Sequence, residues 1–122
     1  FDRARVELAL GRSVVLDASF ATDDERAAAR QLAAAASAAP TELVCVLDPE
    51  VANERIRRRL AEGHDASDAD PAVAAAMSAT FAPWPDAVAV PTDDPPDEAV
   101  TRAVAATGAR PYPRLRHFQE PS

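Results

Sequence analysis

The chain has 122 residues, enough for one domain with a single hydrophobic core. Its formal net charge of -7 argues against nonspecific binding to nucleic acid or to anionic membranes, and we expect neither as a partner. All 13 basic residues are arginine, which excludes every chemistry that needs a lysine, including a Schiff base and the phosphate-binding lysine of a P-loop.

Cysteine and histidine are too few for the sites that these residues often build. The single cysteine, Cys45, lies in an apolar run, and we expect it to be a small buried side chain. One cysteine cannot form an internal disulfide, and two scattered histidines do not indicate a zinc site. The sequence contains no visible signal peptide or membrane span, which favours a cytoplasmic location. Because it opens on Phe1 rather than methionine, we expect a piece of a longer protein.

Helical patterns and apolar runs alternate along the first half of the chain. A first helix is indicated by apolar residues at helical spacing before a glycine: Phe1, Ala4, Leu8 and Gly11. Residues 13–17 (SVVLD) are typical of a buried strand that ends on an aspartate. Thr22 and Glu25 then form a capping box for an alanine-rich helix that we expect to run to about Ala39.

The second half continues this alternation. A second apolar run, residues 43–47 (LVCVL), also ends beside an aspartate, Asp48, which we expect to cap a helix over residues 49–62. A polar loop follows, and then an apolar helical stripe: Val73, Met77 and Phe81. We expect a short third strand over residues 87–90 and a last helix that ends at Gly108.

The order of these elements predicts the fold class. Strands that are apolar throughout and that alternate with helices favour a parallel sheet with both faces covered, so the expected class is α/β with three strands. Trp84, which lies between prolines, is expected to be a hydrophobic plug over the core rather than a base-stacking platform.

Two places carry residues suited to chemistry. Ligands of open parallel sheets bind beyond the carboxyl ends of the strands, so Asp17 is a candidate for metal or hydroxyl chemistry; otherwise it is a turn or capping residue. In the segment ERIRRRL, Arg55 and Arg59 are one helical turn apart and could together clamp a phosphate. The alternative is a solvated helix face whose arginines pair with nearby acids.

Two sequence patterns together indicate a family. They are the strand-end pattern VVLDASF and the pattern RIRRR followed by GHDASDAD. In this order and spacing they resemble the latter two thirds of the P-loop kinase-like ATP-binding domains of the AAA type. These domains are relatives of polynucleotide kinase and zeta-toxin kinases, and in some bacterial proteins they follow an aminoglycoside phosphotransferase-like domain. The resemblance covers residues 1–107 and implies a three-layer parallel sheet of P-loop kinase type that lacks the first strand and the P-loop. Residues 108–122, rich in proline and arginine, are expected to be a tail or linker.

The resemblance also implies roles for individual residues. Asp17 would lie near the transferred phosphate and position substrate, or Mg²⁺ through water, with Ser19 as a supporting substrate contact. Arg55 and Arg59 would close over the phosphates of ATP as lid arginines and stabilise charge during transfer, and Arg58 would make a weaker substrate contact. Two further residues fall in the family's lid motif and could simply cap the next helix: Ser67 and Asp68.

One departure from the family pattern limits the activity that we expect. The family needs a glycine-rich loop ending in Gly-Lys-Ser/Thr, whereas this chain has three scattered glycines and no lysine. The loop, the expected catalytic base and the first strand would precede Phe1. In the family that strand lies between those that correspond to residues 13–17 and 43–47. Without it we expect that the sheet closes up, that an upstream segment or a partner supplies the strand, or that the piece is marginally stable.

Three readings of the function follow. The leading hypothesis is the carboxyl-terminal part of an ATP- and Mg²⁺-dependent kinase-like phosphotransferase domain with a small-molecule phosphate acceptor, inactive as this chain alone. The second is a degenerate, non-catalytic ATPase-like scaffold or interaction module, and the third is a small α/β binding domain unrelated to kinases. Residues upstream of Phe1 distinguish the first two, because a strand followed by Gly-x-x-x-x-Gly-Lys-Ser/Thr there favours a working kinase.

Overall fold

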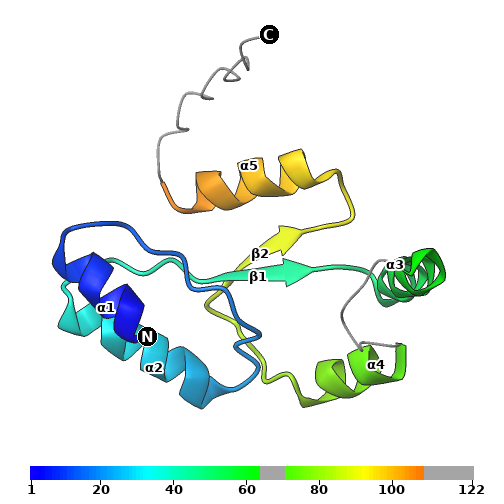
Figure 1. Ribbon diagram of the computed structural model, residues 1–122, viewed down its shortest axis with the longest axis horizontal. Helices are drawn as coiled ribbons and strands as arrows, with labels where there is room; N and C mark the ends of the chain where they lie inside the picture. The colour runs from blue at the N-terminus through cyan, green and yellow to red at the C-terminus, as the bar shows by residue number, and fades with distance from the viewer. Residues whose placement is uncertain (64–70, 109–122) are drawn as a thin grey trace, which may run out of the picture.

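A computed structural model describes residues 1–63 and 71–108, so Ser67, Asp68 and the predicted tail from residue 109 onward lie outside the described residues. The elements follow in the order α1 (Asp2–Ala9), α2 (Asp23–Ala35), β1 (Leu43–Val46), α3 (Pro49–Glu62), α4 (Pro71–Thr80), β2 (Val88–Pro91) and α5 (Pro96–Ala106) (Figure 1). The longest of these helices, α3, has 14 residues, and none of the described helices has the length and hydropathy of a membrane span.

The helices begin where the sequence predicts. Thr22 Oγ1 accepts a hydrogen bond from the Glu25 N–H at 3.3 Å, and Glu25 Oε2 accepts one from the Thr22 N–H at 3.1 Å, so the predicted capping box starts α2. Asp48 caps α3 by accepting a hydrogen bond from the Glu50 N–H at 2.8 Å, and Pro49 occupies the first turn.

Helix α2 ends earlier than the predicted boundary near residue 39. Ser37 adopts a left-handed backbone with a φ of 53°, and the N–H of the next residue, Ala38, donates to the carbonyl of Ala33 at 2.9 Å. This is a Schellman motif with serine at the position that glycine usually takes. The backbone turn therefore stops the helix before Pro40 does.

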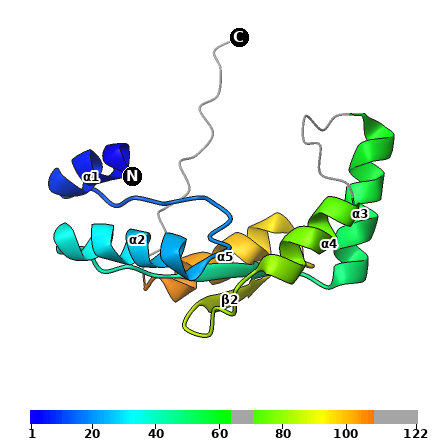
Figure 2. The same cartoon turned by 90° about the horizontal axis from the view of Figure 1, so that it is seen from below.

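Strands β1 and β2 pair in parallel, with Leu43 opposite Val88 and Cys45 opposite Val90. The predicted second and third strands are thus confirmed. Helix α5 packs against β2, while α3 and α4 form a pair beyond the carboxyl end of β1 (Figure 1). Helices α1 and α2 lie side by side at the opposite end of the sheet, in both views (Figures 1 and 2).

The predicted first strand, residues 13–17, is not formed in the described part of the chain, so the prediction of three strands is wrong there. Residues 13–17 run without regular structure between α1 and α2, the sheet has only two strands, and Val15 is 90% exposed (Figure 2). A strand is stabilised by a hydrogen-bonded neighbour, and β2 is the strand paired with β1. The fold is therefore a small α/β arrangement of two parallel strands with helices, and the sheet has not closed up around residues 13–17.

The core of the described part is thin. Its buried hydrophobic side chains are Ala4, Leu32, Ile56 and Val90. Cys45, predicted to be buried, is exposed, and Val46 beside it is 40% exposed. The prediction for Cys45 is wrong because a sheet of two strands is too narrow to shield both sides of β1 from water.

Candidate functional site

Asp17 and Ser19, which the family resemblance places near the transferred phosphate and the substrate, lie in the connection between α1 and α2. Asp17 and Ser19 are both exposed in the segment without regular structure. The next residue, Phe20, has a φ of 44°, a left-handed backbone that costs a residue with a Cβ about 1 kcal/mol. This bend redirects the chain from residues 13–17 into the cap of α2. Asp17 is thus carried by a loop, and its catalytic and metal-positioning roles stay predictions.

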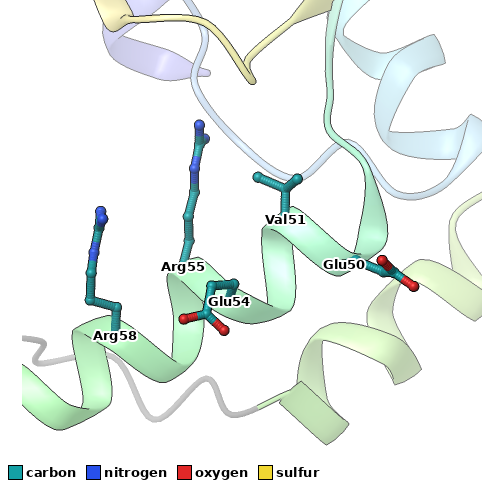
Figure 3. A pocket seen from close by; sticks show the side chains of 5 residues that line it. All are labelled: Glu50, Val51, Glu54, Arg55 and Arg58. Carbon is teal, nitrogen blue, oxygen red and sulfur yellow. The ribbon is translucent and has the colours of Figure 1, made fainter.

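A shallow hollow of about 440 Å³ lies beside α3, and two arginines contribute to it. It is lined by Glu50, Val51, Glu54, Arg55 and Arg58. Figure 3 shows the side chains of Arg55 and Arg58 extending from the same side of α3. Residues three apart on a helix share a face, so both guanidinium groups are presented in one direction.

The two arginines differ in how firmly they are held. Arg55 donates from Nη1 to the carbonyl oxygen of Thr92 at 2.7 Å and from Nη2 to that of Asp93 at 3.3 Å. These carbonyls follow β2, so Arg55 joins α3 to the sheet. Arg58 is 70% exposed and lies 3.9 Å from a carboxylate oxygen of Glu62. An exposed pair at that distance is weak, which leaves the Arg58 guanidinium able to meet an anion.

The structure pairs the α3 arginines differently from the sequence interpretation. Arg59 is exposed and is not among the residues that line the hollow, whereas Arg58 takes the place beside Arg55. The contacts of Arg55 and Arg58 described above do not include Asp17. The lid role of Arg55 and Arg59 and the substrate contact of Arg58 therefore stay predictions.

The described residues offer phosphate ligands more readily than metal ligands. Within residues 1–63 and 71–108 no three histidine, cysteine, aspartate or glutamate side chains gather as a metal site. Mg²⁺ commonly keeps several waters and takes one or two carboxylates plus phosphate oxygens. Asp17 is one exposed carboxylate and would supply at most one such contact, so its metal role stays a prediction, as does phosphate binding by the arginines of α3.

Sequence reasoning missed a buried arginine beside the Asp17 loop. Arg26 is 2% exposed, and its guanidinium lies 4.9 Å from the ring centre of Phe81 and 4.3 Å from that of Trp84. The signal is weak in the sequence, because these aromatic partners lie more than fifty positions away. Trp84, predicted as a hydrophobic plug over the core, is half-buried and packs against Arg26.

Glu42, the residue before β1, binds both Trp84 and a second arginine, Arg30. Arg30 donates to its two carboxylate oxygens at 2.5 and 2.7 Å, and the Trp84 Nε1–H donates to Oε2 at 2.6 Å. The hydrogen bond from Arg30, and then that from Trp84, lower the pKa of Glu42 below its ordinary value, although burial opposes this change. Glu42 is therefore a charged junction between α2, β1 and the segment that follows α4.

Comparison with known proteins gives the family. The model of an AAA domain family matches residues 1–84, which include Asp17 and all of α3. "Uncharacterized protein Mb2027c" of Mycobacterium bovis and "Uncharacterized protein Rv2004c" of Mycobacterium tuberculosis are each 37% identical to this chain over 101 residues, 83% of its length. The matched part is 20% of each relative, so the chain spans about a fifth of their length. No solved structure matches the chain. Because the family match covers more than half of the sequence, the chain belongs to the AAA domain family, in its P-loop kinase-like branch.

Proposed function

We propose that the chain is the lid-side part of a kinase-like domain that binds ATP and Mg²⁺ and phosphorylates a small molecule. Membership of the family supports a nucleotide-binding, kinase-like character. The observation that carries the proposal is the pair Arg55 and Arg58, which extend from one side of α3 over a hollow (Figure 3). Guanidinium groups bind phosphate oxygens through short, charge-assisted hydrogen bonds and hold a planar geometry that suits them.

The arginines would act on charge that develops during transfer. Arg58, weakly paired with Glu62, would bind a phosphate oxygen and stabilise its negative charge. Arg55 would have to exchange the carbonyls of Thr92 and Asp93 for phosphate oxygens. A hydrogen bond between two charged groups is stronger than one to a neutral carbonyl, which would favour that exchange. Arg59 would approach the phosphates when α3 moves toward them.

The exposed loop before α2 would serve the acceptor side. Asp17 would hold the acceptor hydroxyl or a water of the metal, and Ser19 would add a hydrogen bond. Mg²⁺, when bound, would neutralise part of the charge of the phosphates. The chain has no lysine to hold the β and γ phosphates, so we expect no phosphoryl transfer from it alone.

The free edge of β1 supports completion by a further strand. The N–H groups of Val88 and Thr92 donate to the carbonyls of Glu42 and Val46, each at 2.9 Å. A strand turns alternate residues to each of its neighbours, so the backbone groups of Cys45 face the other edge. An apolar strand from the longer protein, placed between that edge and residues 13–17, would cover Val15 and complete the site.

The test is binding of magnesium-ATP, measured by calorimetry on this chain and on a longer protein that includes the sequence upstream of Phe1. We expect the chain alone not to bind and the longer protein to bind. In the longer protein, Arg58→Gln should weaken binding at least tenfold, because it removes one charge-assisted contact. Arg57→Gln is the matched control: Arg57 is on the same helix, does not line the hollow and pairs with Glu54 at 3.7 Å. Its effect should stay below twofold.

Two outcomes would overturn the proposal. If the longer protein binds no magnesium-ATP, the nucleotide site is lost and the non-catalytic scaffold becomes the better function. The exposed apolar side chains Val15, Val46 and Val88 favour that second candidate, since surfaces of this kind serve protein contacts. If the longer protein binds but Arg58→Gln and Arg57→Gln behave alike, α3 is not the lid.

A further inference from the structure

Arg26 joins two segments that are far apart in the sequence. Its Nε donates to the carbonyl oxygen of Phe20 at 2.8 Å, on the loop that carries Asp17 and Ser19. Its Nη1 and Nη2 donate to the carbonyls of Pro83 and Ala82, each at 2.8 Å. Residues 82 and 83 lie where the chain returns from α4 toward β2. The side chain thus connects the candidate acceptor loop with one end of the α3–α4 pair.

The surroundings of this guanidinium leave it little freedom. The side chain of Arg26 is 1% exposed, lies 3.2 Å from Asp23 Oδ1, and packs against the rings of Phe81 and Trp84. A backbone hydrogen bond from the Ala82 N–H to the Ala21 carbonyl, at 2.9 Å, runs alongside it. A buried charge is strongly destabilising unless its donors are all satisfied, so the carbonyls must keep their positions around Arg26.

The loop on the Asp17 side is strained, and Arg26 bonds directly to the strained residue. Phe20 has a φ of 44° and offers its carbonyl to the Arg26 Nε. Left-handed backbone at a residue with a Cβ persists only where surrounding contacts determine it. The bond to Arg26 is such a contact, and it holds the turn three residues after Asp17.

We propose that Arg26 is a positioning residue that fixes the Asp17 loop relative to α3 and α4. From that loop, contacts lead through Arg26 to residues 82 and 83, which lie in the segment between α4 and β2. From the end of β2, the Thr92 carbonyl accepts from Arg55 of α3. The Asp17 loop and α3 are therefore held by arginine hydrogen bonds to the segments that come before and after β2. The catalytic consequence rests on the proposed function, whereas the mechanical link between the two segments does not.

The link is tested by amide hydrogen exchange of the longer protein, read peptide by peptide. Arg26→Gln should speed exchange at residues 20–23 and 81–86 at least tenfold and change β1 and α3 less than twofold. Arg26→Lys keeps the charge but lacks the planar fork that reaches several carbonyls at once, so it should show the same local pattern. Arg102→Gln is the control, because Arg102 is 44% exposed and pairs with Asp94, which follows β2 in the sequence, whereas residues 82 and 83 precede it. It should leave both segments unchanged.

An even rise of exchange over all peptides would make Arg26 a general core residue and overturn the inference, as would unchanged exchange at the two segments. If Arg26→Gln does not fold, Arg26→Lys decides by the same criteria. Where the longer protein phosphorylates an acceptor, Arg26→Lys should lower kcat at least tenfold and change KM for ATP less than threefold. A rise of KM for ATP as large as the fall of kcat would refute the positioning role. Absence of any phosphorylation would count against the proposed function, while the exchange pattern would still decide on the link.

Discussion

Replacing Glu42 tests whether the charged junction before β1 stabilises the fold. Glu42→Gln keeps the shape of the side chain and one carbonyl acceptor but removes the charge that Arg30 and Trp84 share. We expect the variant to be less stable at neutral pH and as stable as the original chain in acid. The reason is that the pKa of Glu42 is lowered in the folded state.

The magnitude follows from the Trp84 hydrogen bond, 2.6 Å long and partly buried. A hydrogen bond to a charged acceptor contributes about 1 kcal/mol more than one to a neutral acceptor. Arg30 lowers the pKa of Glu42 more than Trp84 does, but its side chain is 43% exposed and water screens the ion pair, so the magnitude is worked from Trp84 alone. A carboxyl whose folded pKa is lowered stabilises the fold fully above its unfolded pKa. That stabilisation is lost as the pH falls below the ordinary 4.5 and through the lower folded value.

Urea unfolding followed by tryptophan emission measures this difference, since Trp84 is the single tryptophan and lies at the junction. For a chain of this size about 1 kcal/mol moves the urea midpoint by roughly 0.5–1 M. Glu98→Gln is the control, an exposed carboxylate 3.8 Å from Arg102 that should cause no shift at either pH. The reasoning would be refuted if the urea midpoints of Glu42→Gln and the original chain differed by the same amount at pH 7 and at pH 3. It would also be refuted if the two midpoints did not differ at pH 7.

Three further substitutions probe other features. Thr22→Ala removes the capping box and should destabilise α2 by about 1 kcal/mol, measured by loss of helical circular dichroism on heating, whereas Thr101→Ala, an exposed helix position, should not. Ile56→Ala should cost about 3 kcal/mol and abolish cooperative melting, because Ile56 is one of few buried apolar side chains; a melting curve that stays cooperative would contradict the thin core. Val15→Ser should not shift the melting temperature of this chain, since Val15 is 90% exposed. It should lower that of the longer protein if a further strand covers Val15, and equal behaviour in both would contradict the inserted strand.

Helix boundaries were predictable because their causes are local. The Thr22 capping box and the Asp48 cap each depend on residues within three positions, and single-sequence patterns contain that information. Ser37 is the exception among the helix ends, because serine rarely adopts the left-handed backbone that stops α2. Whether an apolar run forms a strand depends on residues far away in the sequence. Residues 43–47 and 13–17 have the same apolar pattern, yet in the described part of the chain only residues 43–46 pair with another strand.

The site was predictable in type and not in arrangement. The arginine-rich face of α3 could be found from charge and helical spacing, but the choice of Arg58 over Arg59 beside Arg55 depends on where the helix lies against the β2 end. Arg26 could not be found, because nothing in its neighbourhood in the sequence reveals that Phe81 and Trp84 will enclose it. Long-range contacts decide both points.

Helix α3 begins just after the carboxyl end of β1 and extends away from it, as Figure 2 shows, so any rotation at its start would be amplified along its length. Its 14 residues make a rod of about 21 Å. With a helix of that length, a rotation of about 10° at Asp48 would displace the far end by about 4 Å. It would move Arg55, near the middle of the helix, by only about 2 Å. Arg55 also donates a hydrogen bond to the Thr92 carbonyl, and this bond would have to break before α3 could rotate. Under the proposed function, phosphate oxygens would accept the Arg55 hydrogen bonds instead, and the distance travelled by the far end of α3 would then be set by the length of the helix.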